Sequence, residues 1–545
     1  MIRAAFLSVP LLATLAVGCP SVGGGVAGAG GVAAATRAER APPELRLKGI
    51  EPFAAAYDTQ TPVDLDEIQG ALLVQLRDAA TRVQQRPPET DREVIRATFE
   101  ICRGLPAEGP PPAALVDFGL RSHGVIDPPP HLVVADLPPT GSVKLSSELR
   151  DRLARVLRRR YYRRVGLAVC RPLLTPRRRR VVVALFEGRL RIASLPRRLA
   201  KGMVFEVRAR VLSAHRDPQL VIADPLGKVT MQRMRSSGID RVAKLRCDRA
   251  GLYQVEVTGV GQHGSEVLAN FPVYCGVPPP SSTRVFAHRP VLRDAAQVEG
   301  ELVRLTNALR RNAGLPTLAD HRALRAVARA HSRDMQAADF VGHISKSTGG
   351  PADRVRRARI PFLIVRENVA RAYSASEALH QLAQSPAHLS NLLNTDTTHL
   401  GIGVVIDRSQ SLPVLLITQN FISLGRTFNP KTAYRDAKAL IDAKRRAAGV
   451  SAVSHSPILS RLAQAYLADF FAKGAKHADR KLNAALNKLG ASFSRLGGLL
   501  LKVSVLDGIA QAKEIVAVDI AAVGLGIRRE SSGRIVVFVL LGKTR

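Results

Sequence analysis

Most signatures that would identify an enzyme or a nucleic-acid-binding protein are missing from this sequence. It contains no HExxH helix, no Ser/His/Asp order of an acyl-transfer triad and no recognisable cysteine nucleophile. Signatures of zinc fingers, OB folds and RNA-recognition modules are missing as well. After the N-terminal segment, no stretch is long and apolar enough to span a membrane. These absences argue against the common hydrolase classes, against specific nucleic-acid binding and against a later membrane-spanning helix.

The chain begins with an apolar run. Arg3 precedes residues Ala4 to Val17, which are too few to cross a bilayer and end in small residues before Cys19. This pattern predicts a signal peptide over residues 1–18. The sequence around Cys19 resembles a bacterial lipobox, in which diacylglycerol is attached to the cysteine, although Ala16 stands where leucine is usual. An ordinary cleaved signal peptide followed by a chance cysteine is the alternative.

Export to the cell envelope follows from this N-terminus. We expect residues 19–44 to form a lipid anchor and a flexible tether rich in glycine and alanine. The lipid would hold the protein on a membrane, at the outer membrane or the cell surface. Because Pro20 rather than aspartate follows the cysteine, retention in an inner membrane is less expected.

Cysteine is scarce, with five among 545 residues. Lipidation of Cys19 would leave Cys102, Cys170, Cys247 and Cys275, and two disulfides could form in an oxidising compartment. Cys247 and Cys275 flank a predicted strand-turn-strand, which favours that pair and leaves Cys102 with Cys170. Four free thiols are the alternative.

Acidic residues are outnumbered, and the net charge is +35. A field of this size attracts anionic partners such as lipid head groups, lipopolysaccharide, acidic glycans or nucleic acid. An arginine bias also follows from a GC-rich genome. The basic run at residues 158–164 contains tyrosines but has no nucleic-acid-binding motif beside it. We therefore expect an anionic surface among the partners, and no specific nucleic acid.

Length indicates about three or four domains, and the strongest pattern lies at residues 295–425. Apolar residues at helical spacing predict a helix that Gly314 ends and a second helix that Asp320 caps. Two loops are expected to carry Gly342-His343 and Arg366-Glu367-Asn368. Ser385-Pro386 predicts a helix start with His388 at its third position. Two apolar segments then predict a closing β-hairpin.

The order of motifs in this segment resembles the CAP superfamily of cysteine-rich secretory proteins, antigen 5 and pathogenesis-related proteins, in its cysteine-poor bacterial branch. The matching elements lie in order along residues 302–421. They are Leu302-x4-Asn307-x2-Arg310, Ala328-x-Ala330-His331, Gly342-His343, Glu367-Asn368, Ser385-Pro386-x-His388-x2-Asn391, Gly401-Ile402-Gly403 and Gln419-Asn420-Phe421.

The resemblance implies a three-layer α-β-α sandwich with a cleft in which histidines and glutamates converge and in which some members hold a divalent metal. His343, Glu367 and His388 are the matching positions. Ser385 stands where the secreted eukaryotic forms have glutamate, so three candidate ligands remain. Two imidazoles and one carboxylate would suit Zn²⁺ with a water in the fourth place. Without the resemblance, His343 and His388 are ordinary loop and cap histidines, and His331 is a core histidine.

The sequence as a whole predicts a multidomain α/β protein. Residues 433–545 repeat the opening and closing motifs of the CAP-like segment without its polar site and are interpreted as a degenerate CAP-like repeat. Residues 45–187 are interpreted as a more degenerate α/β copy. Residues 188–277 contain short alternating strands typical of a small immunoglobulin-like β-sandwich. Residues 278–294 are expected to be a linker into the CAP-like unit.

Two classes of function follow. The first is a non-catalytic envelope binding or scaffold protein whose cleft holds a peptide, glycan or lipid. The second is a metal-assisted hydrolase of envelope polymer or protein, in which a zinc-polarised water attacks and Glu367 acts as base. Because the hydrolase motifs are missing, we favour the binding or scaffold function over the hydrolase function.

Overall fold

The structure is a computed structural model that describes residues 44–138, 147–286, 294–408, 413–425, 428–488, 495–530 and 534–543. The predicted signal peptide and Cys19 lie outside the described residues. Among the helices of these ranges, none has both the length and the apolar character needed to cross a membrane.

The N-terminal domain combines four helices with a three-stranded antiparallel sheet of order β3-β5-β4. The helices are α1 (Glu67–Arg82), α2 (Arg92–Arg103), α3 (Ala113–Ser122) and α4 (Ser147–Arg159), and the strands are β3 (His131–Leu137), β4 (Arg164–Cys170) and β5 (Arg179–Phe186). Residues of α1, α4 and the sheet share one apolar core. The disulfide Cys102–Cys170 joins α2 to β4.

The next domain is a β-sandwich of two sheets. One has the order β11-β10-β14-β15-β8 and the other β12-β13-β9-β6. The strands are β6 (Leu190–Ile192), β8 (Arg198–Leu199), β9 (Val204–Val211), β10 (Arg216–Ala223), β11 (Val229–Arg233), β12 (Arg235–Ser237), β13 (Asp240–Arg246), β14 (Gly251–Gly261) and β15 (Gly264–Cys275). Alternate residues such as Tyr253, Val255 and Val257 point into the core between the sheets. The disulfide Cys247–Cys275 lies in this core. Both disulfides therefore join the pairs that the sequence favoured.

The expected linker at residues 278–294 contains a strand. β16 (Ser282–Phe286) pairs antiparallel with β1 (Glu44–Lys48). A polar, proline-containing sequence concealed this strand because its partner is more than two hundred residues away in the chain. Long-range pairing of this kind leaves no local pattern.

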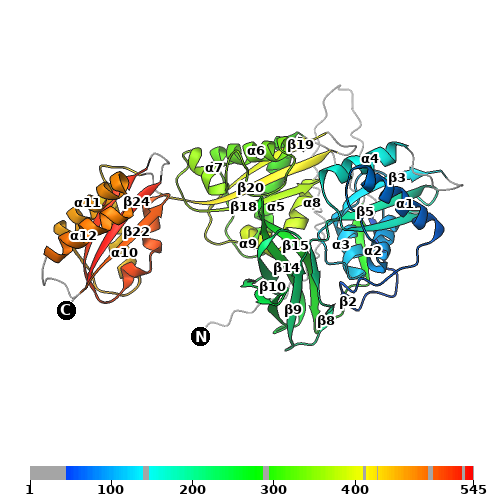
Figure 1. Ribbon diagram of the computed structural model, residues 1–545, viewed down its shortest axis with the longest axis horizontal. Helices are drawn as coiled ribbons and strands as arrows, with labels where there is room; N and C mark the ends of the chain where they lie inside the picture. The colour runs from blue at the N-terminus through cyan, green and yellow to red at the C-terminus, as the bar shows by residue number, and fades with distance from the viewer. Residues whose placement is uncertain are drawn as a thin grey trace, which may run out of the picture. The chain divides into compact units, whose positions relative to one another are not determined.

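The CAP-like segment is a sheet of order β17-β19-β20-β18 between two layers of helices (Figure 1). Its strands are β17 (Ala319–Asp320), β18 (Phe362–Ala372), β19 (His399–Asp407) and β20 (Val414–Leu424), and its helices are α5 (Ala295–Asn312), α6 (Arg322–Ala337), α7 (Pro351–Arg357), α8 (Ala375–Gln384) and α9 (Pro386–Leu392). Helices α5 and α8 share one apolar core with the sheet, and α6 and α7 share another on its opposite side.

Two local predictions for this segment were wrong. His321, not Asp320, caps α6, because Asp320 is part of β17 and the Nδ1 of His321 accepts from Leu324 N at 3.1 Å. Arg366, Glu367 and Asn368 lie in β18 rather than in a loop, paired with β20. Polar residues in a strand resemble a loop in sequence, but here they are at the cleft, where their side chains have partners.

The C-terminal domain has the same strand order, β21-β23-β24-β22. Its elements are α10 (Ala433–Ala447), β21 (Ser454–His455), α11 (Pro457–Lys473), α12 (Ala475–Lys488), β22 (Arg495–Val503), β23 (Ile520–Arg529) and β24 (Ile535–Lys543). In both domains the short first strand pairs parallel with the third, and the other pairs are antiparallel.

Each of these two domains contains a buried arginine with an equivalent set of backbone partners. Arg310 donates through Nε to Pro316 O at 2.9 Å and through one terminal nitrogen to Leu392 O and Asn394 O, both at 2.8 Å. Arg445 donates in the same way to Ser451 O, Ile515 O and Ala517 O at 2.8, 2.7 and 3.0 Å. Each guanidinium joins the C-terminal end of its domain's first helix, α5 or α10, to the segment that precedes the third strand, β19 or β23. The two domains therefore share this buried interaction as well as their strand order.

The N-terminal domain shares part of this pattern. Glu89 forms a parallel bridge with Arg164 at the start of β4, as β17 does with β19. Asp91, two residues later, caps α2, which packs on that strand. His321 and Ser456 cap the corresponding helices, each directly after its own short strand. The three α/β domains therefore have a common order of strands around one helix.

Candidate functional site

The site is centred on Glu367 of β18, whose side chain contacts Arg354 of α7. The side chain of Glu367 is 1% exposed. Oε1 lies 3.0 Å from Nδ1 of His343, and Oε2 accepts from Arg354 at 2.6 Å. Burial by itself raises the pKa of Glu367, but the hydrogen bond with His343 and the charge of Arg354 lower it below its usual value. Glu367 is therefore an ionised carboxylate with both oxygens engaged.

Arg354 was not singled out in the sequence, yet it organises the site. Besides binding Glu367, it donates to the backbone carbonyls of His343 at 3.0 Å and Gly349 at 2.6 Å. Its side chain is 4% exposed. A basic residue in a basic helix carries no distinguishing signal, so its role became visible only when α7 was placed beside β18.

His331 is also part of the site. It is fully buried, its Nε2 lies 2.9 Å from Gly342 O, and the same nitrogen is 3.9 Å from Oε1 of Glu367. Burial lowers its pKa, so the ring is neutral. Its Nδ1 has no hydrogen-bond partner in the described part of the chain. The contact of Nε2 agrees with the interpretation of His331 as a core histidine, whereas Nδ1 is buried without a partner among the described residues.

His388 stands at the third position of α9, whose N-cap is Ser385. Its Nδ1 lies 2.7 Å from Ser385 Oγ, and Ser385 Oγ donates to Oε2 of Glu256 at 2.5 Å. Because the single hydroxyl proton of Ser385 goes to Glu256, Nδ1 of His388 is left to donate and Nε2 is an acceptor. Burial and the nearby His343 lower the pKa of His388 to about 3.

Glu256 belongs to strand β14 of the β-sandwich, not to the CAP-like segment. It is fully buried, and burial raises its pKa to about 7 against the hydrogen bonds from Ser385, the Ala387 backbone and Asn270. Ser385 occupies the position where the eukaryotic family members have glutamate. A neighbouring domain thus supplies a carboxylate to the same region of the site.

The turn between β14 and β15 supports the loop of His343. His263 O accepts from His343 N at 2.7 Å and from Ile344 N at 2.9 Å, and the ring of His263 stacks on Phe340 with centroids 4.5 Å apart. A Cβ at Gly342 would collide with His263. Glycine is therefore required at this position by the approach of another domain.

A family model for the cysteine-rich secretory protein family, CAP, matches residues 303–421. The protein contains a CAP domain. Two relatives from Bacillus subtilis align with it over 125 residues, or 23% of this chain. The uncharacterized membrane protein YlbC is 36% identical over 34% of its own length, and the uncharacterized protein YkwD is 34% identical over 46% of its own length. The chain thus spans less than half of either relative.

Solved structures give weaker alignments. An extracellular protein containing a SCP domain from Bacillus anthracis is 20% identical, with 41% of this chain and 67% of that chain covered and a TM-score of 0.22. A cysteine-rich secretory protein from Staphylococcus aureus is 17% identical, with 43% and 82% covered and a TM-score of 0.20. These alignments support no further conclusion.

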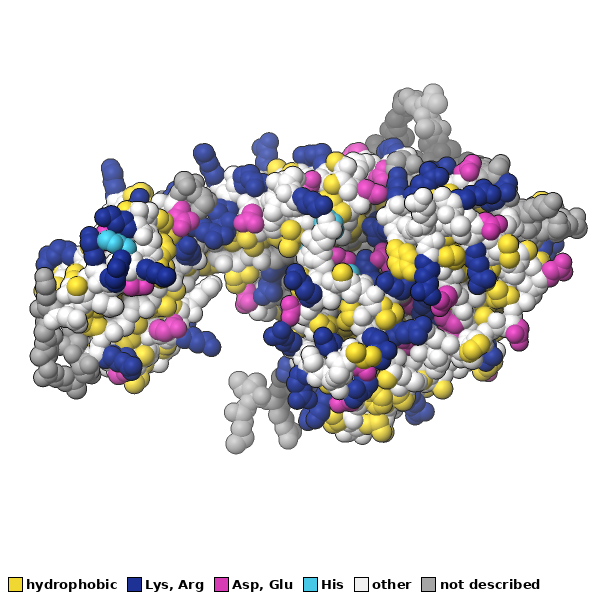
Figure 2. All heavy atoms as spheres, in the orientation of Figure 1, with side chains coloured by type: hydrophobic (Ala, Val, Ile, Leu, Met, Phe, Trp, Pro, Cys, Tyr) yellow, Lys and Arg dark blue, Asp and Glu magenta, His cyan; other side chains and the backbone are white. Residues whose placement is uncertain are grey.

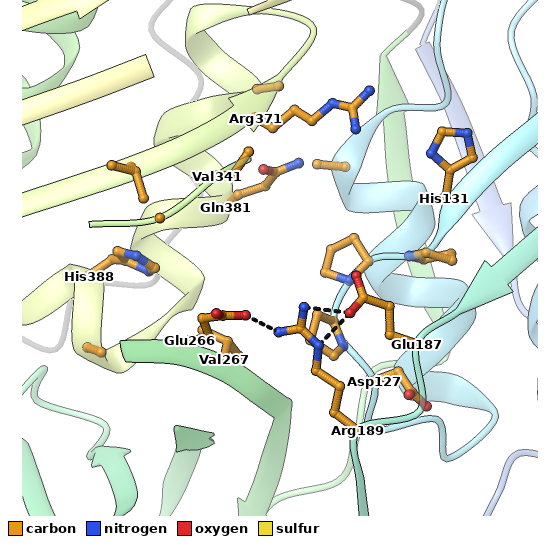
Figure 3. Close-up of a pocket in the computed structure, with 18 of the residues that line it drawn as sticks. Asp127, His131, Glu187, Arg189, Glu266, Val267, Val341, Arg371, Gln381 and His388 are labelled. Carbon is orange, nitrogen blue, oxygen red and sulfur yellow. Dashed lines mark hydrogen bonds and ion pairs between the residues drawn. The ribbon is translucent and has the colours of Figure 1, made fainter. Parts of the chain in front are cut away.

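The CAP cleft opens into a cavity of about 620 Å³ that three domains line (Figure 3). The CAP domain contributes His343, Glu367 and His388, and β15 contributes Glu266 and Val267. The N-terminal domain and the segment after it contribute the opposite side, lined by residues that include Asp127, His131, Tyr162, Glu187 and Arg189. The cleft of the CAP domain is therefore one wall of a larger composite site.

The residues do not fit the metal that the family resemblance implied. Among the described residues, no group of three His, Cys, Asp or Glu side chains is arranged to hold an ion. Arg354 places a positive charge 2.6 Å from Glu367 Oε2, where a divalent cation would be repelled. His343 directs Nδ1 to Glu367, and His388 directs Nδ1 to Ser385. Only the Nε2 atoms of these two histidines remain available, and two nitrogens without a carboxylate fall short of the three protein ligands of a catalytic zinc site.

Proposed function

We propose that this protein is an exported envelope protein that binds a small ligand in the composite cavity without transforming it. The observation that supports this most is the cavity itself, lined by three domains, with its carboxylates and most of its basic groups already paired. Pre-formed concave sites with mixed apolar and polar walls are typical ligand sites. The ligand would be a peptide, a glycan or a lipid of the envelope.

The two disulfides support export, because such bonds persist in oxidising compartments. A lipid anchor at Cys19 is part of the proposal, and so is a position at the outer membrane or cell surface. One relative is named a membrane protein, which agrees with attachment to an envelope.

The flanking domains complete the proposal. We interpret residues 433–545 as a degenerate CAP-like repeat, supported by the equivalent interactions of Arg310 and Arg445. Residues 45–187 would be a more diverged copy, supported by the bridge between Glu89 and Arg164. The β-sandwich would be an immunoglobulin-like domain that supports the cleft through Glu256 and His263.

A metal-assisted hydrolase has less support. A zinc-bound water would need Glu367 as a ligand or a base. In this arrangement Glu367 has a lowered pKa and is bound to Arg354, so it is a weak base with no free oxygen.

The proposal can be tested on the protein isolated from envelopes of cells that produce the full chain. Native mass spectrometry should detect a bound small molecule on the wild type. Gln381→Trp, which fills the cavity from α8, should release it. The contrary result would be one equivalent of bound metal that His343→Ala/His388→Ala removes, together with metal-dependent hydrolysis of envelope material.

A further inference from the structure

One arginine of the cavity wall has no counter-charge. Arg371 lies on β18, where its backbone pairs with β20, and it lines the cavity; among the described residues its guanidinium makes no hydrogen bond or ion pair. In Figure 3 its guanidinium extends from the CAP strand toward the side on which His131 lies. The side chain is half-buried, so the charge is only partly solvated.

The other arginines of the lining differ from Arg371 in this respect. Arg160 pairs with Glu187 at 3.1 Å, and Arg189 pairs with both Glu187 and Glu266. Arg366 pairs with Asp396 at 3.6 Å. The carboxylates of the wall are engaged as well, as Glu367 is by Arg354. Arg371 is therefore the uncompensated cation of this cavity in the described part of the chain.

Arg371 faces groups that leave its charge available. Burial first, and then the charges of Arg371 and Arg160, lower the pKa of His131 to about 4, so its ring is neutral. The ring of Tyr162 lies beside it, with centroids 6.5 Å apart. Both side chains can donate or accept hydrogen bonds next to an anion. Glu377 also lines the cavity, and burial raises its pKa to about 7, which weakens it as a counterion.

Beside its paired polar groups, the rest of the cavity wall has an apolar part. It includes residues of all three domains, among them Pro128, Pro129, Pro130, Val267, Val341 and Val369. Apolar walls gain free energy when they exclude water against an apolar ligand. A single cation at one side of such walls favours a ligand with one anionic group.

We propose that Arg371, with His131 and Tyr162 of the N-terminal domain, forms a subsite for the anionic group of an amphiphilic ligand whose apolar part lies against the proline and valine walls. This rests on the proposed function of the composite cavity and adds the chemical class of its ligand. The subsite lies between the CAP and N-terminal domains, so an isolated CAP domain would lack half of it.

Two dyes of similar shape test the charge requirement. Anilinonaphthalene sulfonate is an amphiphilic anion, and phenylnaphthylamine is its neutral counterpart. Fluorescence titration of the wild type should give tighter binding of the sulfonate by about tenfold, the worth of one partly buried ion contact of about 1.4 kcal/mol. Arg371→Gln should abolish this preference without changing the affinity for the neutral dye, and Arg371→Lys should keep part of it.

Arg311→Gln is the matched control, because Arg311 is exposed on α5 away from the cavity lining. It should leave both affinities unchanged. A sulfonate preference that survives Arg371→Gln, or equal affinities for both dyes in the wild type, would overturn the anionic subsite alone. If neither dye binds the wild type, or if Gln381→Trp leaves dye binding intact, the composite cavity is not a ligand site and the proposed function fails with it.

Discussion

At the scale of single residues, the site contains two sets of polar groups that pair with one another. Arg354, Glu367 and His343 form one set, and Glu256, Ser385 and His388 form the other. Buried polar groups are costly unless they are paired, so the removal of one member should be felt by its partners.

Arg354→Leu is expected to destabilise the CAP domain by about 3 kcal/mol, because it leaves the buried carboxylate of Glu367 without its cation. The double variant Arg354→Leu/Glu367→Leu should recover much of this loss, since no unpaired charge remains. Chemical denaturation of both variants measures the difference. Equal destabilisation in the single and double variants would show that packing, not charge, determines the effect.

Glu256 should make stability depend on pH. Its pKa rises from 4.5 to about 7 on folding, because burial disfavours the charged form. Its contribution is therefore fully present below pH 4.5, is lost as the pH rises to about 7, and is constant above. Within this window the loss is about 1.4 kcal/mol per pH unit.

Glu256→Gln keeps the shape of the side chain but does not titrate. The difference in unfolding free energy between wild type and variant should shift in favour of the variant as the pH rises from 4.5 to about 7. Urea unfolding of both proteins across this range measures it. Stability curves that stay parallel would contradict a buried, titrating Glu256.

At the scale of elements, one strand of the CAP sheet and one of the C-terminal sheet each lie close to a helix. A Cβ at Gly403 of β19 would collide with the backbone of Arg329 in α6, and one at Gly526 of β23 would collide with Ala463 in α11. Glycine allows strand and helix to approach at these positions, which explains why a Gly-x-Gly pattern occurs in both domains.

Gly403→Ala should therefore destabilise the CAP domain, by more than about 2 kcal/mol, because backbone atoms must move apart. Gly300→Ala is the control in the same domain. Gly300 lies in α5 with no atom within 4 Å of an added Cβ, so the substitution should stabilise the helix by about 0.5–1 kcal/mol. Thermal unfolding of both variants compares them, and a neutral Gly403→Ala would refute the close-contact explanation.

At the scale of the whole molecule, the excess of basic residues is distributed rather than gathered into one patch on the face that Figure 2 shows. On the face shown in Figure 2, lysine and arginine side chains are spread over every domain with acidic side chains among them. A net charge of +35 still creates a long-range attraction for anionic surfaces. Such an attraction would act together with the proposed lipid anchor.

The Cys19→Ser protein, which cannot be lipidated, should bind vesicles that contain anionic lipid and not zwitterionic vesicles. The attraction is worth about 1 kcal/mol per basic residue near the surface and is screened by salt. Binding in sedimentation assays should therefore fall steeply as salt is raised. Salt-independent binding, or equal binding to zwitterionic vesicles, would refute an electrostatic origin.

The sequence by itself determined the CAP domain and suggested that residues 433–545 repeat its opening and closing motifs. Both depend on local patterns: apolar periodicity, helix caps, and glycines that allow a strand to approach a helix. The order of such motifs carries the family resemblance, and that resemblance named His343, Glu367 and His388 before their positions were known. Their spacing could not predict which groups would pair with them.

Only the tertiary structure decided what surrounds the cleft. Glu256 is 129 residues from Ser385, and Arg354 is 13 residues from Glu367 on a separate element. Both look like ordinary charged residues in sequence, because the signal of a buried pair appears only when two distant segments meet. The same holds for Arg371 and its missing counterion, since a charge is uncompensated only with respect to everything packed around it.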